Sequence, residues 1–282
     1  MTAAFFISCL ASLGGLSGAF LLLPFQVTVL GFNGPAVTPT NLVFNITAIP
    51  SGVYRFIREK RMVWSLAWTL VIGTLPGTFI GAIIRVKYLP DPRAFKVFVA
   101  AALLYIGSRL LRDVFSKTEK ARIKSKHAKF EVGDSSFDLK SIGYTFNGEA
   151  YSVPTGWILA LSFFVGIIGG IYGIGGGAII APFLVTVFRL PVHSIPGVSL
   201  FSTFVSSAAG TLIFTFIAPH FAVTNASVSP DWLLGFTFGV GGFAGIYVGA
   251  RLQKHIPPKI IKAVLAACIL VVVIRYTIEF LP

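Results

Sequence analysis

Long apolar runs without charged residues alternate with short polar loops along this chain. A helix needs about 20 mostly apolar residues to cross a bilayer, and several runs come close to or exceed that length. The pattern therefore predicts an all-α polytopic membrane protein. The charge-free runs are 36–53, 63–84, 194–217 and 232–250, two runs with basic residues near their ends are 94–111 and 260–280, and the two longest apolar segments are 3–31 and 157–188.

One of these segments is interrupted by glycine. Residues 166–182 hold seven glycines and one proline, and each glycine costs a helix about 1 kcal/mol relative to alanine. Irregular backbone at membrane depth is tolerated only where protein buries it or where it lines a water-filled cavity. We therefore predict a broken helix that borders a binding site at Gly173, Gly175, Gly176 and Gly177.

Other glycines recur every fourth residue, which places them on one face of a helix. Small residues on one face let membrane helices pack closely, so we expect a packing role for these positions rather than a site. They are Gly73, Gly77 and Gly81 in one apolar run and Gly241, Gly245 and Gly249 in another.

The chain contains an internal repeat. A shift of 158 residues places Gly15, Gly18 and Pro24 on Gly173, Gly176 and Pro182 without a gap, and a shift of 168 places Trp64 on Trp232. Duplicated membrane segments of this kind are common in secondary transporters. We predict a first membrane repeat at 1–113, a basic linker at 114–156 and a second membrane repeat at 157–282.

The positions of lysine and arginine suggest how the repeats are oriented. Basic residues mark cytoplasmic loops, and they cluster in loops 55–62, 114–156 and 251–259. If each glycine-broken segment returns to its own side, each half makes three crossings and the second half is inverted. The linker then lies in the cytoplasm, where we expect a plain solvated loop, and only Arg85, Lys87 and Arg93 fall on the opposite side.

Polar side chains recur at equivalent places in the second segment of each half. Asn41 and Asn45 are four residues apart and share a helix face, and the same shift of 158 places them on Ser199 and Thr203. These side chains could bind a ligand, or they could hold helices together, as such residues often do in membranes. Prolines near both pairs and in both glycine segments predict helix breaks at Pro24, Pro39, Pro182 and Pro196.

The ionisable residues exclude several classes of function. The net charge is +13, but its concentration in loops fits a membrane protein better than a nucleic-acid-binding one. No carboxylate or histidine lies in the middle of a predicted span, and no cluster has the spacing of metal ligands. Catalytic pairs and a phosphate-binding P-loop are also missing. We expect no enzyme, no metal and no cofactor.

An anion fits the remaining chemistry. The N-terminus of a half-helix presents unpaired N–H groups and partial positive charge, and it binds sulfate- or carboxylate-like groups without a cationic side chain. Glycine lets that backbone approach the ligand. The hypothesis requires the two broken segments to meet in the membrane and to leave room for the anion. Continuous helices or a tightly filled junction would contradict it.

The motifs resemble one known family. The segments Gly169–Pro182 and Gly14–Pro24, the steps Val198–Leu200 and Thr40–Leu42, and the late segment Gly241–Ala250 are similar to those of the TauE/SafE sulfite exporter (TSUP) family. The resemblance implies a membrane permease for sulfite, sulfonates or related small anions, commonly an exporter. The first repeat reads Gly15-Leu-Ser-Gly-Ala where the pattern is richer in glycine, so the halves need not contribute equally.

We therefore predict a secondary transporter in the cell membrane, with a small sulfur-containing anion and the lipid bilayer as its partners. A passive anion channel and a membrane scaffold without transport remain alternatives, and the sequence leaves open whether the chain forms a homo-oligomer. The predicted substrate-binding residues are Gly15, Gly18, Asn41, Asn45, Gly173, Gly175, Gly176, Gly177, Ser199 and Thr203.

Overall fold

The protein is described from a computed structural model, which covers most of both predicted repeats. It describes residues 1–32, 34–91, 132–138, 140–221 and 227–257, and the single residues 97, 101, 104, 105, 108, 112, 260, 263 and 270. The predicted apolar runs 94–111 and 260–280, Arg93 and linker residues 114–131 lie wholly or largely outside these described residues.

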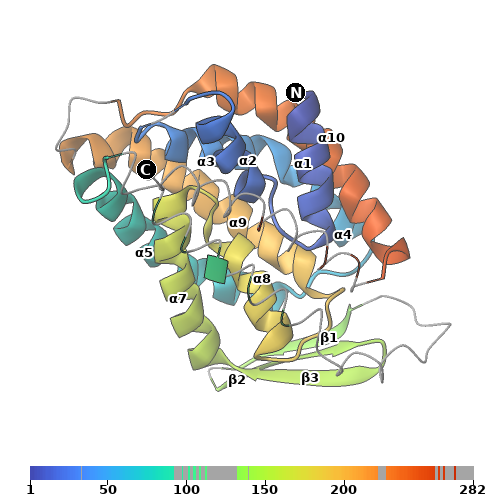
Figure 1. Cartoon of the computed structure of the whole chain (residues 1–282). Coiled ribbons are helices and arrows are strands. Elements are labelled where there is room, and N and C mark those ends of the chain that lie inside the picture. The colour runs from blue at the N-terminus through green and yellow to red at the C-terminus, as the bar shows by residue number, and fades with distance from the viewer. Residues whose placement is uncertain are drawn as a thin grey trace.

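The described part of each predicted repeat is mostly helical (Figure 1). In the first repeat the helices are α1 (Thr2–Leu13), α2 (Ala19–Thr28), α3 (Val37–Ala48), α4 (Pro50–Arg58) and α5 (Trp64–Lys87). In the second they are α7 (Thr155–Tyr172), α8 (Gly176–Thr186), α9 (Ile195–Leu212), the π-helical turn η2 (Ile213–Ile217), the 3-10 turn η3 (Ala218–Phe221), α10 (Trp232–Leu252) and the 3-10 turn η4 (Gln253–His255).

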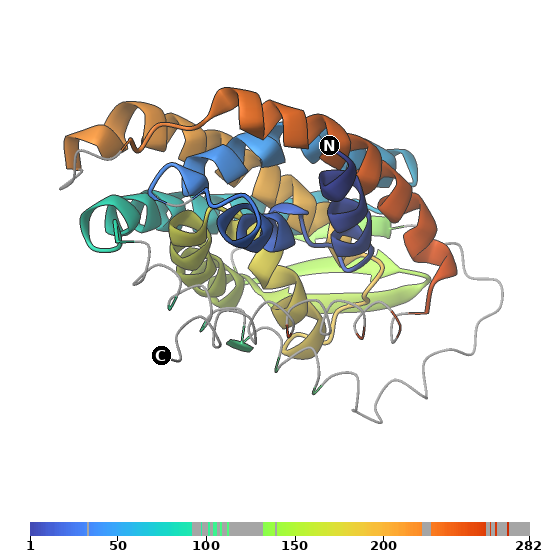
Figure 2. The same ribbon diagram turned by 45° about the horizontal axis from the view of Figure 1, so that its top comes forward.

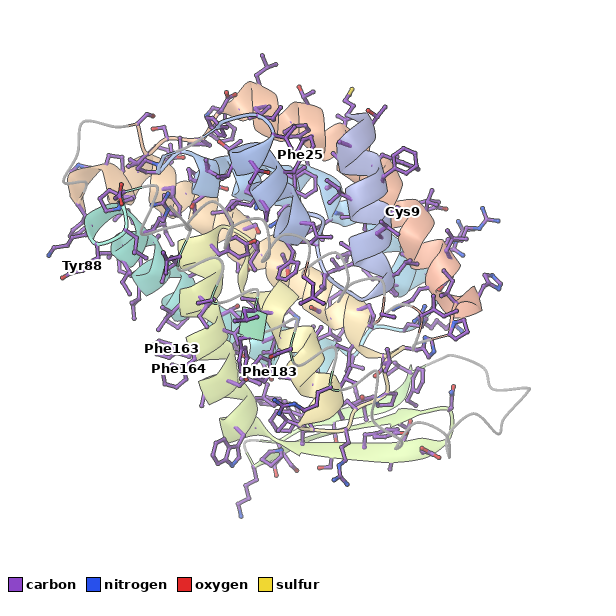
Figure 3. All side chains as sticks on the ribbon, viewed as in Figure 1. Cys9, Phe25, Tyr88, Phe163, Phe164 and Phe183 are labelled. Atoms are coloured by element: carbon purple, nitrogen blue, oxygen red, sulfur yellow. The ribbon has the colours of Figure 1, made fainter. Side chains whose placement is uncertain are left out.

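Four helices in the described residues are long and apolar enough to cross a membrane, namely α5, α7, α9 with its continuation to Phe221, and α10. Large apolar side chains cover their outer surfaces: Phe164 on α7 is 62% exposed and Leu233 on α10 is 79% exposed. Figure 3 shows Phe163 and Phe164 pointing outward from α7. Exposed apolar surface of this extent is suited to lipid, so the prediction of a polytopic helical membrane protein is confirmed.

The helices α5 and α10, which correspond to one another in the repeat, each pack along the first helix of the other half. α5 lies beside α7, and α10 lies beside α1, in both ribbon views (Figures 1 and 2). The glycines spaced by four make this contact. A methyl group on Gly77 would lie 2.2 Å from the Phe163 carbonyl oxygen, and one on Gly245 would lie 2.3 Å from the Phe5 carbonyl oxygen. The predicted packing role of these glycines is confirmed.

Residues 132–154 form a three-stranded antiparallel sheet in the order β1 (Val132–Phe137), β2 (Ser141–Phe146) and β3 (Glu149–Pro154). The sheet lies at one end of the helical body (Figure 1). Along β2, Ile142, Tyr144 and Phe146 are buried and alternate with less buried neighbours. This is the period-two pattern of a strand with one covered face.

The sheet corrects the expectation of a plain solvated loop in this part of the linker. Asn147 and Gly148 join β2 to β3 with positive φ angles of 53° and 80°, as the commonest two-residue hairpin turn requires. An Asn-Gly pair flanked by alternating apolar residues is a strong hairpin signal. The basic residues of the whole segment favoured a solvated loop, and this hairpin signal was overlooked.

The sheet is attached to two loops of the membrane part. The Val132 N–H donates to the Lys60 carbonyl oxygen at 2.8 Å, just before α5. The Tyr144 hydroxyl lies 2.9 Å from Ser194 Oγ, just before α9. Burial raises the pKa of Tyr144 to about 12, so its phenol stays protonated and can keep this hydrogen bond. The sheet therefore covers the ends of α5 and α9 on one side of the protein.

Candidate functional site

Both glycine-broken segments contain the same turn. α1 ends at Leu13 and Gly15 has a φ of +74°, while α7 ends at Tyr172 and Gly173 has a φ of +80°. Both φ values are in the left-handed region that only glycine adopts without strain. The Leu16 N–H donates to the Ala11 carbonyl oxygen at 3.1 Å, and the equivalent Ile174 N–H donates to the Gly169 carbonyl oxygen at 3.2 Å. The predicted breaks are confirmed in both segments.

The chain resumes as a helix directly after each turn. α2 begins at Ala19 and α8 begins at Gly176, and the N-cap residue of each is a glycine, which has no side chain to cap the first turn. The first N–H groups of a helix have no acceptor within it. In α8, the Gly176 N–H donates to Ser206 Oγ at 3.0 Å. Ser206 is thus a binding partner of the turn that the sequence analysis did not name.

The helices do not break at the predicted prolines. α2 continues past Pro24 to Thr28, and α8 continues past Pro182 to Thr186. Pro39 and Pro196 lie in the first turns of α3 and α9, where a missing N–H costs little. The predicted breaks at these four prolines were therefore wrong, because the glycines end the helices instead.

A proline inside a helix still leaves the carbonyl four residues before it without its usual donor. For Pro24 that carbonyl belongs to Phe20, and the Tyr172 hydroxyl donates to it at 3.0 Å. Tyr172 is fully buried and comes from the other half of the molecule. It therefore connects the end of α7 to α2 and satisfies a backbone group that has no water available.

Asn41 joins the two turns. Its amide Nδ2 donates to the Ala19 carbonyl oxygen at 3.0 Å and to the Gly173 carbonyl oxygen at 3.1 Å. Ser199 occupies the equivalent position in the second half, and its hydroxyl donates to the carbonyl oxygen of Gly177, which is the repeat partner of Ala19. The structure thus brings both turns and both polar helices to one place.

Asn45 and Thr203 lie one helical turn further on. The Asn45 Nδ2 group donates to the Ile174 carbonyl oxygen at 3.1 Å and to Ser207 Oγ at 3.0 Å. Thr203 Oγ1 donates to the Ser199 carbonyl oxygen of its own helix at 2.8 Å. In this state the predicted pairs act mainly as ties between helices. The side-chain oxygens of Asn41 and Asn45 are buried and have no partner among the described residues.

The glycines of both turns pack tightly, within their own half and against the other half. A methyl group on Gly177 would lie 2.1 Å from the Ser199 carbonyl oxygen, and one on Gly173 would lie 2.5 Å from that of Thr38. One on Gly15 would lie 2.9 Å from Pro196, and one on Gly18 would lie 2.2 Å from Ser8 Oγ. The expected open space is therefore absent beside these four glycines, where backbone, proline and hydroxyl groups lie. A ligand could enter only if these contacts separate.

Gly175 is a second glycine with a positive φ in the turn that follows α7. Its φ is +73°, and a methyl group there would lie 2.8 Å from Thr203 Cγ2. The repeat partner of Gly175 is Ser17, which keeps a negative φ. The second turn therefore has two left-handed glycines where the first has one, which is the difference that the glycine-poorer first repeat indicates.

Two buried arginines were missed as candidates. Arg85 in α5 is fully buried and donates from Nε to Thr38 Oγ1 at 3.1 Å. It also donates to the carbonyl oxygens of Gly34, at 2.9 Å, and Leu89. In the sequence, Arg85 was considered only as an exception to the rule that basic residues mark cytoplasmic loops. Its position in an apolar run was the available signal, since ionisable residues within membrane segments usually have a function.

Arg61 is the second buried arginine and lies just before α5. It is 1% exposed, and its NH2 donates to Gln253 Oε1 at 3.0 Å and to the His193 carbonyl oxygen at 2.7 Å. Its NH1 lies 3.1 Å from Glu59 Oε2. Burial lowers the pKa of Arg61, although Glu59 opposes the effect. Burial, and secondly the charge of Arg61, lower the pKa of His193 to about 4, so this imidazole is neutral near pH 7.

In the described residues, no three histidine, cysteine or acidic side chains come together as metal ligands would. The polar groups gathered at the junction are instead amides, hydroxyls and backbone groups from both halves, within a helical membrane protein. Residues 1–276 match the family model described as "Sulfite exporter TauE/SafE". The chain belongs to this family. The match covers both repeats and the sheet, so the resemblance seen in the motifs is confirmed.

Curated relatives of this family agree with that assignment. The chain is 26% identical over 274 residues to the probable membrane transporter protein YunE of Bacillus subtilis, covering 93% of this chain and 90% of the relative. It is also 26% identical over 290 residues to the probable membrane transporter protein YjnA of the same organism, covering 94% of each. No solved structure matches. The protein is thus a TauE/SafE family membrane transporter.

Proposed function

We propose that this protein is a secondary transporter that exports a small sulfur-containing anion, such as sulfite or an organosulfonate. The family description names sulfite export, and both curated relatives carry names that refer to transport. The observation that carries the proposal is the pair of equivalent helix breaks, with Asn41 bonded to both. Broken helices that meet between two repeats are the usual substrate site of such transporters.

The proposed site lies between the first turns of α2 and α8. These turns offer N–H groups and the positive ends of two helix dipoles to an anion. The hydroxyls of Ser199 and Thr203 and the Nδ2 groups of Asn41 and Asn45 supply further donors. In the filled state these donors are bonded to carbonyl oxygens and to Ser207, so the anion would replace those acceptors when the junction opens.

The arrangement of the halves supports an alternating mechanism. α5 packs on α7 and α10 packs on α1, so each glycine-lined contact joins one half to the other. We propose that the halves are inverted repeats and that α5 with α7, and α10 with α1, each move as a unit. Opening of one glycine turn at a time would expose the site to one side. A permanently open pore is disfavoured, because the glycines of both turns are tightly packed.

We further propose a cell-membrane location with the sheet in the cytoplasm. The sheet lies beside the end of α4 and the residues that follow it, which carry Arg55, Arg58 and Lys60, and such clusters mark the cytoplasmic side. Labelling of single cysteines placed at exposed Ser152 or Arg58 with an impermeant reagent tests this orientation. Labelling from the outside of intact cells would contradict it.

Transport by purified protein in proteoliposomes is the direct test of the substrate class. Sulfite, methanesulfonate, sulfate and chloride should be compared, with and without a pH gradient. We expect uptake of at least one sulfur-containing anion and a large loss in Asn41→Leu, which cannot bind both turns. Leu233→Ala, on the exposed surface of α10, serves as the control. Conductance without gradient coupling would support a channel instead. Indifference to every anion would refute the proposed transport of this class and leave the scaffold alternative.

A further inference from the structure

The two buried arginines occupy matching places relative to the two glycine turns. Arg85 donates to the Thr38 hydroxyl, and that hydroxyl donates at 3.2 Å to the carbonyl oxygen of Ile171, two residues before Gly173. Arg61 donates to the Gln253 amide, and that amide donates at 3.0 Å to the carbonyl oxygen of Leu13, two residues before Gly15. Each arginine is thus one polar side chain away from one turn.

The same shifts that relate the repeats relate parts of these two networks. Leu13 and Ile171 are 158 residues apart, as are Gly15 and Gly173, and Arg85 and Gln253 are 168 apart. The networks are therefore partly equivalent by sequence and also similar in their contacts. Arg61 has no arginine at its own repeat position, so the second guanidinium comes from a different element and reaches a corresponding location.

The two arginines lie at opposite ends of the membrane part. Arg61 precedes the first residue of α5, and Arg85 lies two residues before its last residue. At 1.5 Å per residue, α5 separates them by about 30 Å, which is close to the hydrocarbon thickness of a bilayer. One guanidinium is therefore near each side of the membrane.

Their surroundings are costly for a charge. The Arg85 bonds to Thr38, Gly34 and Leu89 end on neutral oxygens, and burial of a charged group is expensive even when its hydrogen bonds are made. A guanidinium can hold a planar or tetrahedral oxyanion through two parallel N–H bonds. An anion that takes these donors would compete directly with the bonds that tie each arginine to its turn.

We infer that Arg61 and Arg85 are two anion-docking residues, one for each side of the membrane, and that docking releases the adjacent glycine turn. At Arg85 the anion competes with the oxygens of Thr38, Gly34 and Leu89. At Arg61 it competes with the Glu59 carboxylate, 3.1 Å from NH1. The inference rests on the proposed function and adds to it two cationic residues that act before the anion reaches the junction.

The test is transport kinetics measured separately from each side. The full-length protein is reconstituted in vesicles sorted by orientation, and sulfite and methanesulfonate are the probes. We expect Arg85→Gln to raise the KM about tenfold on the side of Gly34 and Leu89, the size expected from loss of one charge-assisted hydrogen-bond pair. The KM on the opposite side should stay within about twofold. Arg61→Gln should give the reverse result.

Matched controls separate docking from structure. Lys87→Gln and Arg58→Gln remove the same charge from exposed positions near each arginine and should leave both KM values unchanged. Arg85→Lys and Arg61→Lys keep the charge but lose the two-point contact, so they should show a smaller, still side-specific rise. If the glutamine variants do not fold, these lysine variants carry the same test.

Glu59→Gln provides a gain-of-function test that misfolding cannot mimic. Removal of the competing carboxylate should lower the KM on the Arg61 side and leave the other side unchanged. If folded arginine variants transport with wild-type KM on both sides, or change both sides equally, the docking inference is wrong while the proposed function stands. If the wild type moves none of the tested sulfur anions, the proposed function fails, and the inference fails with it.

Discussion

The turn at Gly15 and the turn at Gly173 begin with the same left-handed glycine but differ in the residues that follow and support it. In both, a left-handed glycine ends one helix and a second helix begins within four residues. The first turn has Ser17 where the second has Gly175, and Gly14 where the second has Tyr172. The repeat therefore preserves the break itself, while the side chains that hold each break have diverged.

The surrounding charges differ as well. Glu59 and His193 surround Arg61 on the Gly15 side, whereas the described bonds of Arg85 on the Gly173 side reach neutral oxygens. A transporter that binds on one side and releases on the other needs unequal sides. The comparison suggests that this inequality is located mainly in the side chains around two turns that share one left-handed glycine.

The largest expected effect is the loss of either left-handed glycine. Gly173→Ala introduces a methyl group 2.5 Å from the Thr38 carbonyl oxygen, and Gly15→Ala introduces one 2.9 Å from Pro196. We expect each to destabilise the fold by more than about 3 kcal/mol, because backbone strain adds to the clash. Gly173→Ala should be the worse of the two. Thermal unfolding in detergent measures the difference.

Gly148→Ala is the matched control for this prediction. Gly148 also has a positive φ, at 80°, but nothing lies within 4 Å of an added methyl group. It should cost only about 1 kcal/mol, the strain of a left-handed alanine. Equal losses in all three variants would mean that backbone conformation alone, and not close packing, fixes the two turns.

The next largest effect is a pH dependence of stability that arises at His193, on the Arg61 side of the protein. The folded pKa of His193 is lowered from its ordinary 6.5 to about 4, so the unfolded chain binds more protons between these values. Stability should therefore fall as pH decreases through 6.5 towards 4, by up to about 3 kcal/mol. His193→Gln should remove that part of the dependence, and His255→Gln at an exposed position should not. An unchanged profile in His193→Gln would contradict the prediction.

A smaller effect concerns the carbonyl that Pro24 leaves without a donor. Tyr172→Phe removes the hydroxyl that donates to Phe20, and a buried unpaired carbonyl costs about 1–3 kcal/mol. Tyr88→Phe, at an exposed position that Figure 3 shows at the edge of the molecule, should have almost no effect. If the two variants unfold alike, water or another donor must reach Phe20.

The sequence was sufficient for features that depend on local chemistry. The helix breaks at Gly15 and Gly173 follow from the cost of glycine in helices. The close helix packing at Gly77 and Gly245 follows from the four-residue spacing of the glycines. The positions of Asn41 and Ser199 near both breaks follow from the repeat. None of these conclusions needs knowledge of which helices face one another.

Features that depend on three-dimensional packing were missed. The sequence cannot show that Thr38 and Pro196 fill the space beside the two turns. It also cannot show that loops and the sheet cover Arg61, since the same residue in an open loop would be solvated. The prolines did not break the helices, because a missing N–H costs little in a first helical turn. At Pro24, the Tyr172 hydroxyl from the other half donates to the carbonyl oxygen that lacks its usual donor.

The variant with the smallest expected change in stability tests most directly how the two turns differ. Ser17→Gly places a glycine at the position that Gly175 occupies in the second turn. The Ser17 hydroxyl is buried without a partner among the described residues, so its removal relieves a desolvation cost that offsets the added chain entropy of glycine. Because the two effects oppose one another, the net change in unfolding free energy should be below about 0.5 kcal/mol.

Transport measurements on Ser17→Gly test whether the Ser17 hydroxyl contacts the anion. If the Ser17 hydroxyl meets the anion when the first turn opens, Ser17→Gly should lose transport while keeping its stability. Ser65→Gly is a useful comparison, because Ser65 Oγ is also buried without a described partner but lies at the start of α5, away from both turns. Equal transport by Ser17→Gly and the wild type would show that the first turn contributes backbone alone, and the two halves would then differ in support but not in chemistry.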